Sequence, residues 1–143
     1  QRTHLEVADT LVREGGLGFS DTKPNRAYNH PLYPTGYRYN KRVLGQSIDG
    51  DGLSYSIGST LVQSAGHTWN VSLRYMQINQ EGSPDPNHSL SPTPQDRADV
   101  QLSHDRLTHF GRFHVGVGYN YVDDEVSGVT TSDFTGFIRW STR

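Results

Sequence analysis

Residues 97–122, RADVQLSHDRLTHFGRFHVGVGYNYV, decide the fold. Apolar and polar side chains alternate one by one on both sides of Thr108-His109-Phe110-Gly111. This period of two is typical of strands that present one apolar face and one polar face. We therefore expect two antiparallel strands, 97–107 and 112–122, joined by a tight turn at 108–111.

The register of this hairpin sorts both faces at once. When the strands are paired across their turn, seven pairs match: three join apolar residues, and four join polar residues to polar residues or glycine. The apolar pairs are Leu102 with Val117, Val100 with Tyr119 and Ala98 with Tyr121. The opposite face pairs Asp105 with His114, Ser103 with Gly116, Gln101 with Gly118 and Asp99 with Asn120.

The same alternation recurs elsewhere in the chain. It predicts strands at 53–63, 68–79 and 132–142, and a weaker strand near 3–12, where Asp9 falls on the apolar face. The connections alternate in length: short turns at 64–67 and 108–111, long loops at about 13–52, 80–95 and 123–131. The long loops are rich in Asn, Asp, Gly, Pro and Ser, which favour turns and loops.

The amino-acid composition excludes several classes of protein and of site. The chain has 143 residues, of which only 32% are hydrophobic, and its net charge is −2. It lacks any apolar run of about 18 residues, so a transmembrane helix is excluded. Eight Tyr, five Phe and two Trp argue against disorder. The charge gives no reason to expect nucleic acid as a partner, and the absence of Cys excludes disulfides and thiolate metal sites.

Strand length and aromatic placement favour an antiparallel transmembrane β-barrel over a soluble β-sandwich. Strands of about 10–12 residues suit a membrane barrel, whereas strands of globular sheets usually have about 5–6. Aromatic residues gather at the strand ends on the apolar face, as interfacial girdles do. These are Trp69 and Phe113 near the short turns, and Tyr55, Tyr75, Tyr119 and Tyr121 near the long loops.

Six strands are too few for a closed membrane barrel, which needs about eight, and lipid does not tolerate open sheet edges. We therefore expect the all-β chain 1–143 to supply about six C-terminal strands of a larger barrel whose N-terminal strands are missing here. The alternative is that several chains complete one barrel. The short turns would be periplasmic and the long loops would lie at the cell surface.

The first long loop concentrates groups suited to sugars. Flat aromatic rings stack on the C–H faces of sugars, and Arg and amide groups bind hydroxyls, uronates or phosphates. The alternative is that these rings pack the loop against itself, as in an Ω-loop. The candidate polysaccharide contacts are Tyr28, His30, Tyr33, Tyr37, Arg38, Tyr39 and Arg42, and the residues alone leave both interpretations open.

This loop resembles a stretch of the Wzi-type capsule-assembly outer-membrane proteins. The similarity lies in Tyr28-Asn29-His30, Tyr33, Gly36-Tyr37-Arg38-Tyr39, Arg42 and Gly45, followed by Asp49 and Asp51. Glu6-Val7-Ala8-Asp9-Thr10 before the loop, and Gly66-His67-Thr68-Trp69 and Leu73-Arg74-Tyr75 after it, also resemble that family. The similarity covers about residues 4–80 well and the remainder by pattern only.

The resemblance implies a large barrel of the bacterial outer membrane that acts as a lectin. Such a protein binds capsular polysaccharide or exopolysaccharide at the cell surface, aids capsule assembly or attachment, and is not an enzyme. Its partners would be that polysaccharide, outer-membrane lipid and the remainder of the barrel. We expect neither a catalytic residue nor a cofactor.

Other candidate sites are weaker. Asp49-Gly50-Asp51-Gly52 could begin a calcium loop, but no Glu follows at the EF-hand position, so we expect a plain turn. The register puts His104 and His114 on opposite faces, which argues against a metal site. Asp105 opposite His114 is expected to be a polar contact in the barrel lumen.

Two other functions stay open. A porin or transporter barrel would use charged lumen residues to select small polar solutes, namely Arg74, Arg97, Asp99, Asp105, Arg112 and Arg139. A soluble β-sandwich carbohydrate-binding module, or a piece of a glycosidase, would also fit the alternation. A glycosidase needs two carboxylates at a defined separation, and Asp49 and Asp51 make no convincing pair.

Overall fold

The computed structural model describes residues 1–14, 21–23, 27–28, 32, 38–39, 42–63, 66–80, 82 and 90–142. Within these residues the chain is all-β and antiparallel. None of the described segments forms a helix with the length and apolar character needed to cross a membrane.

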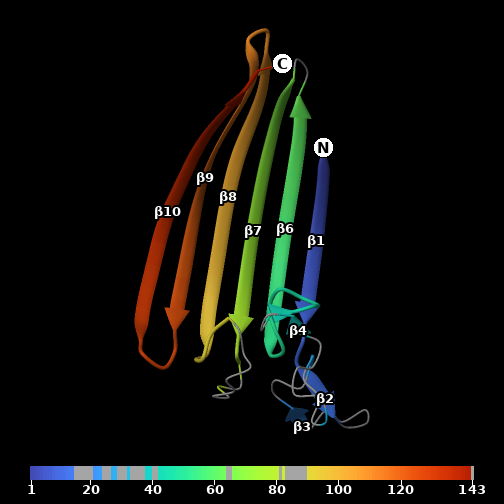
Figure 1. The fold of residues 1–143 in the computed structure, drawn as a ribbon, viewed down its shortest axis with the longest axis vertical. Coiled ribbons are helices and arrows are strands. Elements are labelled where there is room, and N and C mark those ends of the chain that lie inside the picture. The colour runs from blue at the N-terminus through green and yellow to red at the C-terminus, as the bar shows by residue number, and fades with distance from the viewer. Residues whose placement is uncertain are drawn as a thin grey trace.

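One six-stranded sheet forms the body of the molecule (Figure 1). Its strands are β1 (Arg2–Asp9), β6 (Gly52–Gln63), β7 (His67–Ile78), β8 (Gln95–Thr108), β9 (Gly111–Asp124) and β10 (Val129–Ser141). They lie in the order β1-β6-β7-β8-β9-β10, and each is antiparallel to its neighbours. All six predicted strands are therefore present, and β1 and β10 form the edges of the sheet.

The hairpin that we used to predict the fold has the expected register. Leu102 pairs with Val117, Val100 with Tyr119 and Asp105 with His114, as do the other pairs named above. The strands are longer than predicted, because β8 and β9 continue to a two-residue connection at 109–110. His104 and His114 lie on opposite faces, as the register requires.

The long connections differ in three ways from the prediction. β1 ends at Asp9 rather than near residue 12, and Val12–Glu14 (β2) pairs instead with Asp21–Lys23 (β3). A second small hairpin joins Arg38–Tyr39 (β4) to Arg42–Val43 (β5). Finally, the expected loop at 123–131 is only the turn 125–128, because the carboxylate of Asp124 and the positive φ of Gly128 close it tightly.

One face of the sheet, called here the apolar face, is hydrophobic and exposed. A row of apolar residues crosses all six strands, and all but Tyr119 are at least 40% exposed. The row is Leu5, Ile57, Leu73, Val100, Tyr119 and Phe134, each paired with the next. Among the described residues only Ala8, Ile48 and Ile78 are buried hydrophobics, so this part of the chain has almost no core of its own.

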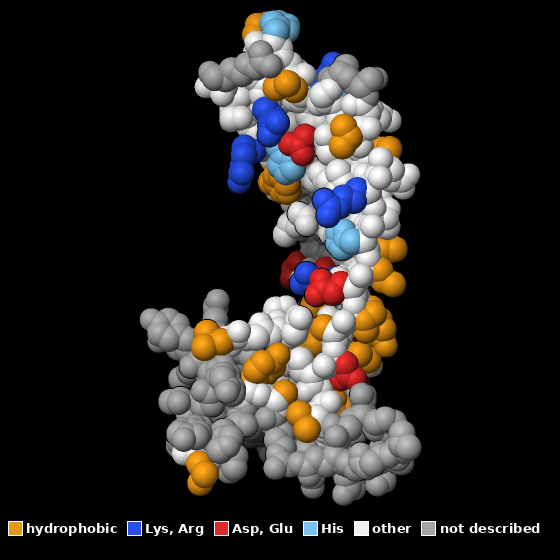
Figure 2. Space-filling model, turned by 90° about the vertical axis from the view of Figure 1, so that its right-hand side faces the viewer, with side chains coloured by type: hydrophobic (Ala, Val, Ile, Leu, Met, Phe, Trp, Pro, Cys, Tyr) orange, Lys and Arg blue, Asp and Glu red, His pale blue; other side chains and the backbone are white. Residues whose placement is uncertain are grey.

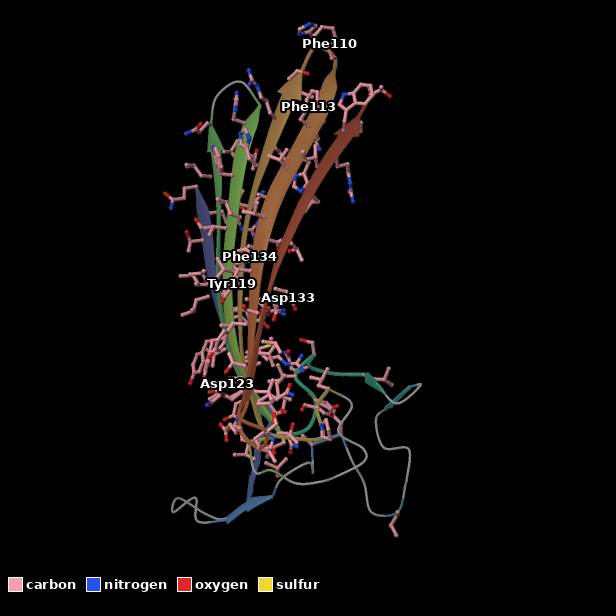
Figure 3. All side chains as sticks on the ribbon, turned by 90° about the vertical axis from the view of Figure 1, so that its left-hand side faces the viewer. Phe110, Phe113, Tyr119, Asp123, Asp133 and Phe134 are labelled. Carbon is pink, nitrogen blue, oxygen red and sulfur yellow. The ribbon has the colours of Figure 1, made fainter. Side chains whose placement is uncertain are left out.

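The other face, called here the polar face, carries charges along its whole length. The next row of side chains is Glu6, Ser56, Arg74, Asp99, Asn120 and Asp133, again paired strand by strand. Figure 2 shows hydrophobic side chains along one side of the sheet and charged ones along the other. Figure 3 shows Tyr119 and Phe134 on one side of the ribbon and Asp133 on the other. A water-soluble sheet with one bare hydrophobic face would aggregate, so this face needs an apolar environment.

Candidate functional site

The three longer connections meet at one end of the sheet, called here the loop end (Figure 1). They join β1 to β6, β7 to β8 and β9 to β10, while the two-to-three-residue connections 64–66 and 109–110 lie at the opposite, short-turn end. This separation follows from an antiparallel meander in which every second connection falls on the same side. The predicted polysaccharide residues all belong to the first of these loops.

The structure describes four of the seven predicted contact residues. Arg38 and Tyr39 form β4, and Arg42 lies in β5, where it pairs with Tyr39. The hairpin therefore brings these three residues of the loop together. His30, Tyr33 and Tyr37 lie outside the described residues, so their proximity to this hairpin stays a prediction.

Tyr28 is the fourth, and it has a structural role within the loop. Its hydroxyl accepts a hydrogen bond from the backbone N–H of Gln46 at 3.2 Å. A Cβ on Gly45 would clash with the Tyr28 ring, so the ring packs directly against the backbone of that glycine. Tyr28 also has φ +66°, a conformation uncommon for a side chain of its size. The packing that we weighed as an alternative to sugar binding is therefore present at this residue.

A buried clasp fixes the first loop to the sheet. The Thr10 hydroxyl accepts a hydrogen bond from Gly52 N–H at 3.0 Å, and the Thr10 N–H donates to the Gly52 carbonyl at 2.9 Å. Beside it, Asn79 N–H donates to the Asp51 carbonyl at 2.7 Å. The Gly52 N–H bonds the hydroxyl of Thr10 instead of a backbone carbonyl, and the ladder between β1 and β6 ends at Asp9.

The segment Asp49–Asp51 is a turn, as expected, but it is not a surface turn. Asp49 is 1% exposed and Asp51 is 0% exposed, beside the buried side chains of Ile48 and Ile78. Asp49 has φ +66°, and its carboxylate accepts a hydrogen bond from Gly50 N–H at 2.7 Å. Sequence reasoning missed this burial, because an Asp-Gly-Asp-Gly run normally indicates exposure.

Asp124 joins the second and third connections. One carboxylate oxygen accepts hydrogen bonds from Ser127 N–H at 2.9 Å and Ser127 Oγ at 3.0 Å, and the other accepts from Thr93 Oγ1 and Gln95 Nε2. The bond from Thr93, followed by those from Ser127 and Gln95, holds the pKa of Asp124 well below its usual range. The carboxylate lies at the loop end of β9 and stays charged.

The polar face forms a second candidate site, a groove of about 460 Å³. Its walls carry carboxylate, guanidinium, imidazole and amide groups, which are all able to hydrogen-bond polar solutes. Six of the lining residues are His4, Glu6, Arg74, Asp99, Gln101 and Asn120. Arg74 and Asp99 face each other across β7 and β8. Both are among the charged residues that the porin hypothesis names.

Asp105 and His114 meet at the short-turn end of the polar face. The Nδ1 of His114 lies 2.9 Å from Oδ1 of Asp105, but the direction between the two atoms does not suit a hydrogen bond. The His114 ring also lies 4.8 Å from that of Phe137, measured between centroids. Within the described part of the chain, no group of three His, Asp or Glu side chains is arranged to hold a metal ion.

Two comparisons with known proteins bear on the chain. Its sequence matches the family described as Capsule assembly protein Wzi over residues 2–133. No curated protein matches the sequence.

Among solved structures, the fold matches Wzi, an outer membrane protein involved in group 1 capsule assembly in Escherichia coli and a carbohydrate-binding β-barrel. The TM-score is 0.65 and the sequence identity is 21%. The match covers 99% of this chain and 30% of that chain. The six-stranded sheet therefore corresponds in fold to part of a β-barrel.

Proposed function

Because the chain belongs to the capsule assembly protein Wzi family, we propose that it forms part of an outer-membrane β-barrel lectin. In this proposal the protein binds capsular polysaccharide or exopolysaccharide non-covalently at the bacterial cell surface and aids capsule assembly or attachment. The binding is not catalytic and needs no cofactor.

The continuous apolar face is the observation that supports a membrane location in this proposal. Polar residues border the apolar face at both ends. One border is the row of Gln77 near the loops, and the other is the row of His67 near the short turns. The ten residue-to-residue steps from Gln77 to His67 span about 33 Å of strand. With the tilt of about 35–45° usual for membrane strands, this gives about 25 Å across the bilayer, the height of the apolar band of outer-membrane barrels.

The loop end is the proposed polysaccharide surface. The β4–β5 hairpin supplies two arginines and a tyrosine, and the Thr10–Gly52 clasp holds the start of β6 against β1. A loop carried by a rigid sheet suits recognition, because little order is lost on binding. The predicted contacts are Tyr28, His30, Tyr33, Tyr37, Arg38, Tyr39 and Arg42.

The test replaces Tyr37 and Arg38 by Ala in the native protein and measures binding of purified capsular polysaccharide. Affinity should fall about tenfold or more, which corresponds to about 1.4 kcal/mol. The matched control replaces His109 and Phe110 by Ala, since this pair joins a basic and an aromatic ring at the short-turn end. Unchanged polysaccharide binding by the Tyr37→Ala, Arg38→Ala variant, with normal heat-dependent gel mobility, would reject this surface.

A porin is the second candidate function, and the polar groove favours it. Charged side chains lining a barrel lumen set the selectivity of a channel. Single-channel conductance of the intact protein separates the two functions. A closed, silent barrel supports the lectin, whereas a conductance that changes selectivity with Arg74→Glu supports a pore.

A further inference from the structure

A hollow of about 540 Å³ opens on the apolar face near the short-turn end. Its side-chain lining is dominated by Trp69, Leu102, Val115, Val117 and Ile138. Its floor lies at Gly136, which pairs with Val117 in β9. A Cβ at Gly136 would meet only the Gly116 carbonyl oxygen, at 3.8 Å, so the missing side chain leaves real space there.

A cationic and aromatic cluster lies at the short-turn side of this hollow. His104 lines the hollow and stacks on Trp69, with ring centroids 4.2 Å apart. His67 Nδ1 lies 3.2 Å from His104 Nε2, and Arg106 pairs with His67 across β7 and β8.

The cluster has no acidic neighbour in the two rows of the apolar face that contain it. These rows are Gln63, His67, Arg106, Phe113 and Trp140, and Leu61, Trp69, His104, Val115 and Ile138. The opposite border of the same face carries Asp9, Asp96 and Asp123 instead. The short-turn border therefore attracts anions, while the loop border repels them.

The two histidines leave one ring N–H for an outside acceptor. A neutral imidazole has one donor and one acceptor nitrogen, so one ring of the pair donates to the other. Whichever ring donates to the other, the accepting ring keeps its own N–H on its second nitrogen. That N–H and the exposed guanidinium of Arg106 are both suited to a phosphate oxygen.

We propose that this cluster and the hollow together bind one anionic glycerophospholipid of the periplasmic leaflet, an inference that rests on the proposed function. The phosphate binds Arg106 and the imidazole N–H, and an acyl chain fills the hollow over Gly136. A second copy of the chain is a poorer occupant, because a symmetric contact would bring the same cations together.

Two substitutions test the two halves of this site. Gly136→Leu fills the hollow, and a Cβ at this position meets no atom closer than the Gly116 carbonyl oxygen at 3.8 Å. Arg106→Gln removes the cationic charge. The controls are Ser132→Leu, on the same face of β10 but away from the hollow, and Arg112→Gln, near the same turn but on the polar face.

The intact native protein is purified, stripped of lipid in detergent, incubated with phosphatidylglycerol and weighed by native mass spectrometry. Wild type and both controls should retain one lipid, while Gly136→Leu and Arg106→Gln should each lower its occupancy about fivefold. Equal occupancy in all five proteins would overturn the site, as would equal loss in the controls. A dimer mass that Gly136→Leu abolishes would show that a second copy fills the hollow instead.

Polysaccharide binding measured on the same preparations separates this inference from the proposed function. If polysaccharide binds normally but lipid occupancy does not distinguish the variants, only the lipid site is wrong. If the native protein does not partition into the outer membrane, the proposed function fails and this inference fails with it. Heat-dependent gel mobility of each variant verifies that its barrel is folded.

Discussion

The hydroxyl of Thr10 shows how much one polar atom can fix at the loop end. Thr10 is 7% exposed, and its hydroxyl accepts a hydrogen bond from Gly52 N–H, where β6 begins. A buried backbone N–H without a hydrogen-bond partner destabilises the fold, because its hydrogen bond to water is lost on folding and nothing replaces it. The residue therefore couples the end of an edge strand to the start of its neighbour.

Thr10→Val should lower the free energy of unfolding by about 1–3 kcal/mol, because valine keeps the shape of threonine but leaves Gly52 N–H unpaired. The measurement is urea unfolding of the refolded barrel in detergent or lipid. Thr130→Val is the matched control, since its hydroxyl donates to Asp123 Oδ1 at 3.2 Å on an exposed surface beside the loops. Equal effects of the two substitutions would show that burial of Thr10 has no energetic consequence.

Residue types alone could not reveal which polar groups of the loop are buried. Asp49 and Asp51 are read from sequence as solvent-exposed turn residues, yet both are enclosed. This segment adjoins Ile78 and Asn79, which are distant in sequence and reach it only through the pairing of β6 with β7. Of the predicted contact residues, Tyr28 packs on Gly45, a contact that spacing cannot predict.

At the scale of elements, the β9–β10 turn depends on one carboxylate. Asp124 accepts hydrogen bonds from Ser127 in its own turn and from Thr93 and Gln95 of the preceding connection. The lowered pKa of Asp124 has a direct consequence for acid stability. Its stabilising effect is present above the unfolded pKa of about 3.9 and is lost only as pH falls through the lower folded pKa.

Asp124→Asn should speed amide hydrogen exchange across 125–128 by about tenfold at neutral pH, because the charge-assisted bonds are lost. In the wild-type protein the turn should remain protected at about pH 4, where an ordinary Asp is half protonated. Asp123→Asn is the control, since this neighbouring carboxylate accepts a hydrogen bond from Thr130 Oγ1 at 3.2 Å. Loss of wild-type protection already at pH 5 would contradict the assigned role of Asp124.

The strands and their register could be predicted because both faces impose the same pairing. Shifting β8 against β9 by one residue would place Asp99 and Gln101 on the apolar face. Only one register therefore keeps polar residues on one face and apolar residues on the other. The short strands β2 to β5 carry no such constraint. With two or three residues each, they are too short for alternation to identify them.

At the scale of the whole molecule, the two faces of the sheet require different surroundings. The apolar face has an uninterrupted hydrophobic row across six strands, while the polar face has Glu6, Arg74, Asp99 and Asp133 in the adjacent row. A sheet of this kind is stable when lipid covers one face and water or polar protein covers the other.

Leu73→Arg tests that requirement, because Leu73 lies in the middle of the apolar row and is 45% exposed. An arginine near the bilayer midplane costs about 2–4 kcal/mol, so the folded fraction in lipid vesicles should fall sharply. Ser72→Arg places the same charge one residue away on the polar face and should fold normally. Heat-dependent gel mobility measures both variants, and similar folding of the two would refute the assignment of the faces.

The separation of Thr10 from Gly52 also bears on the order in which the sheet assembles. Five of the six strands follow one another in hairpins, whereas β1 must close a segment of 42 residues to reach β6. Closing such a segment costs about 2 kcal/mol more in chain entropy than closing a four-residue turn. We therefore expect β6 to β10 to pair first and β1 to dock afterwards, with the Thr10–Gly52 clasp as the last contact to form.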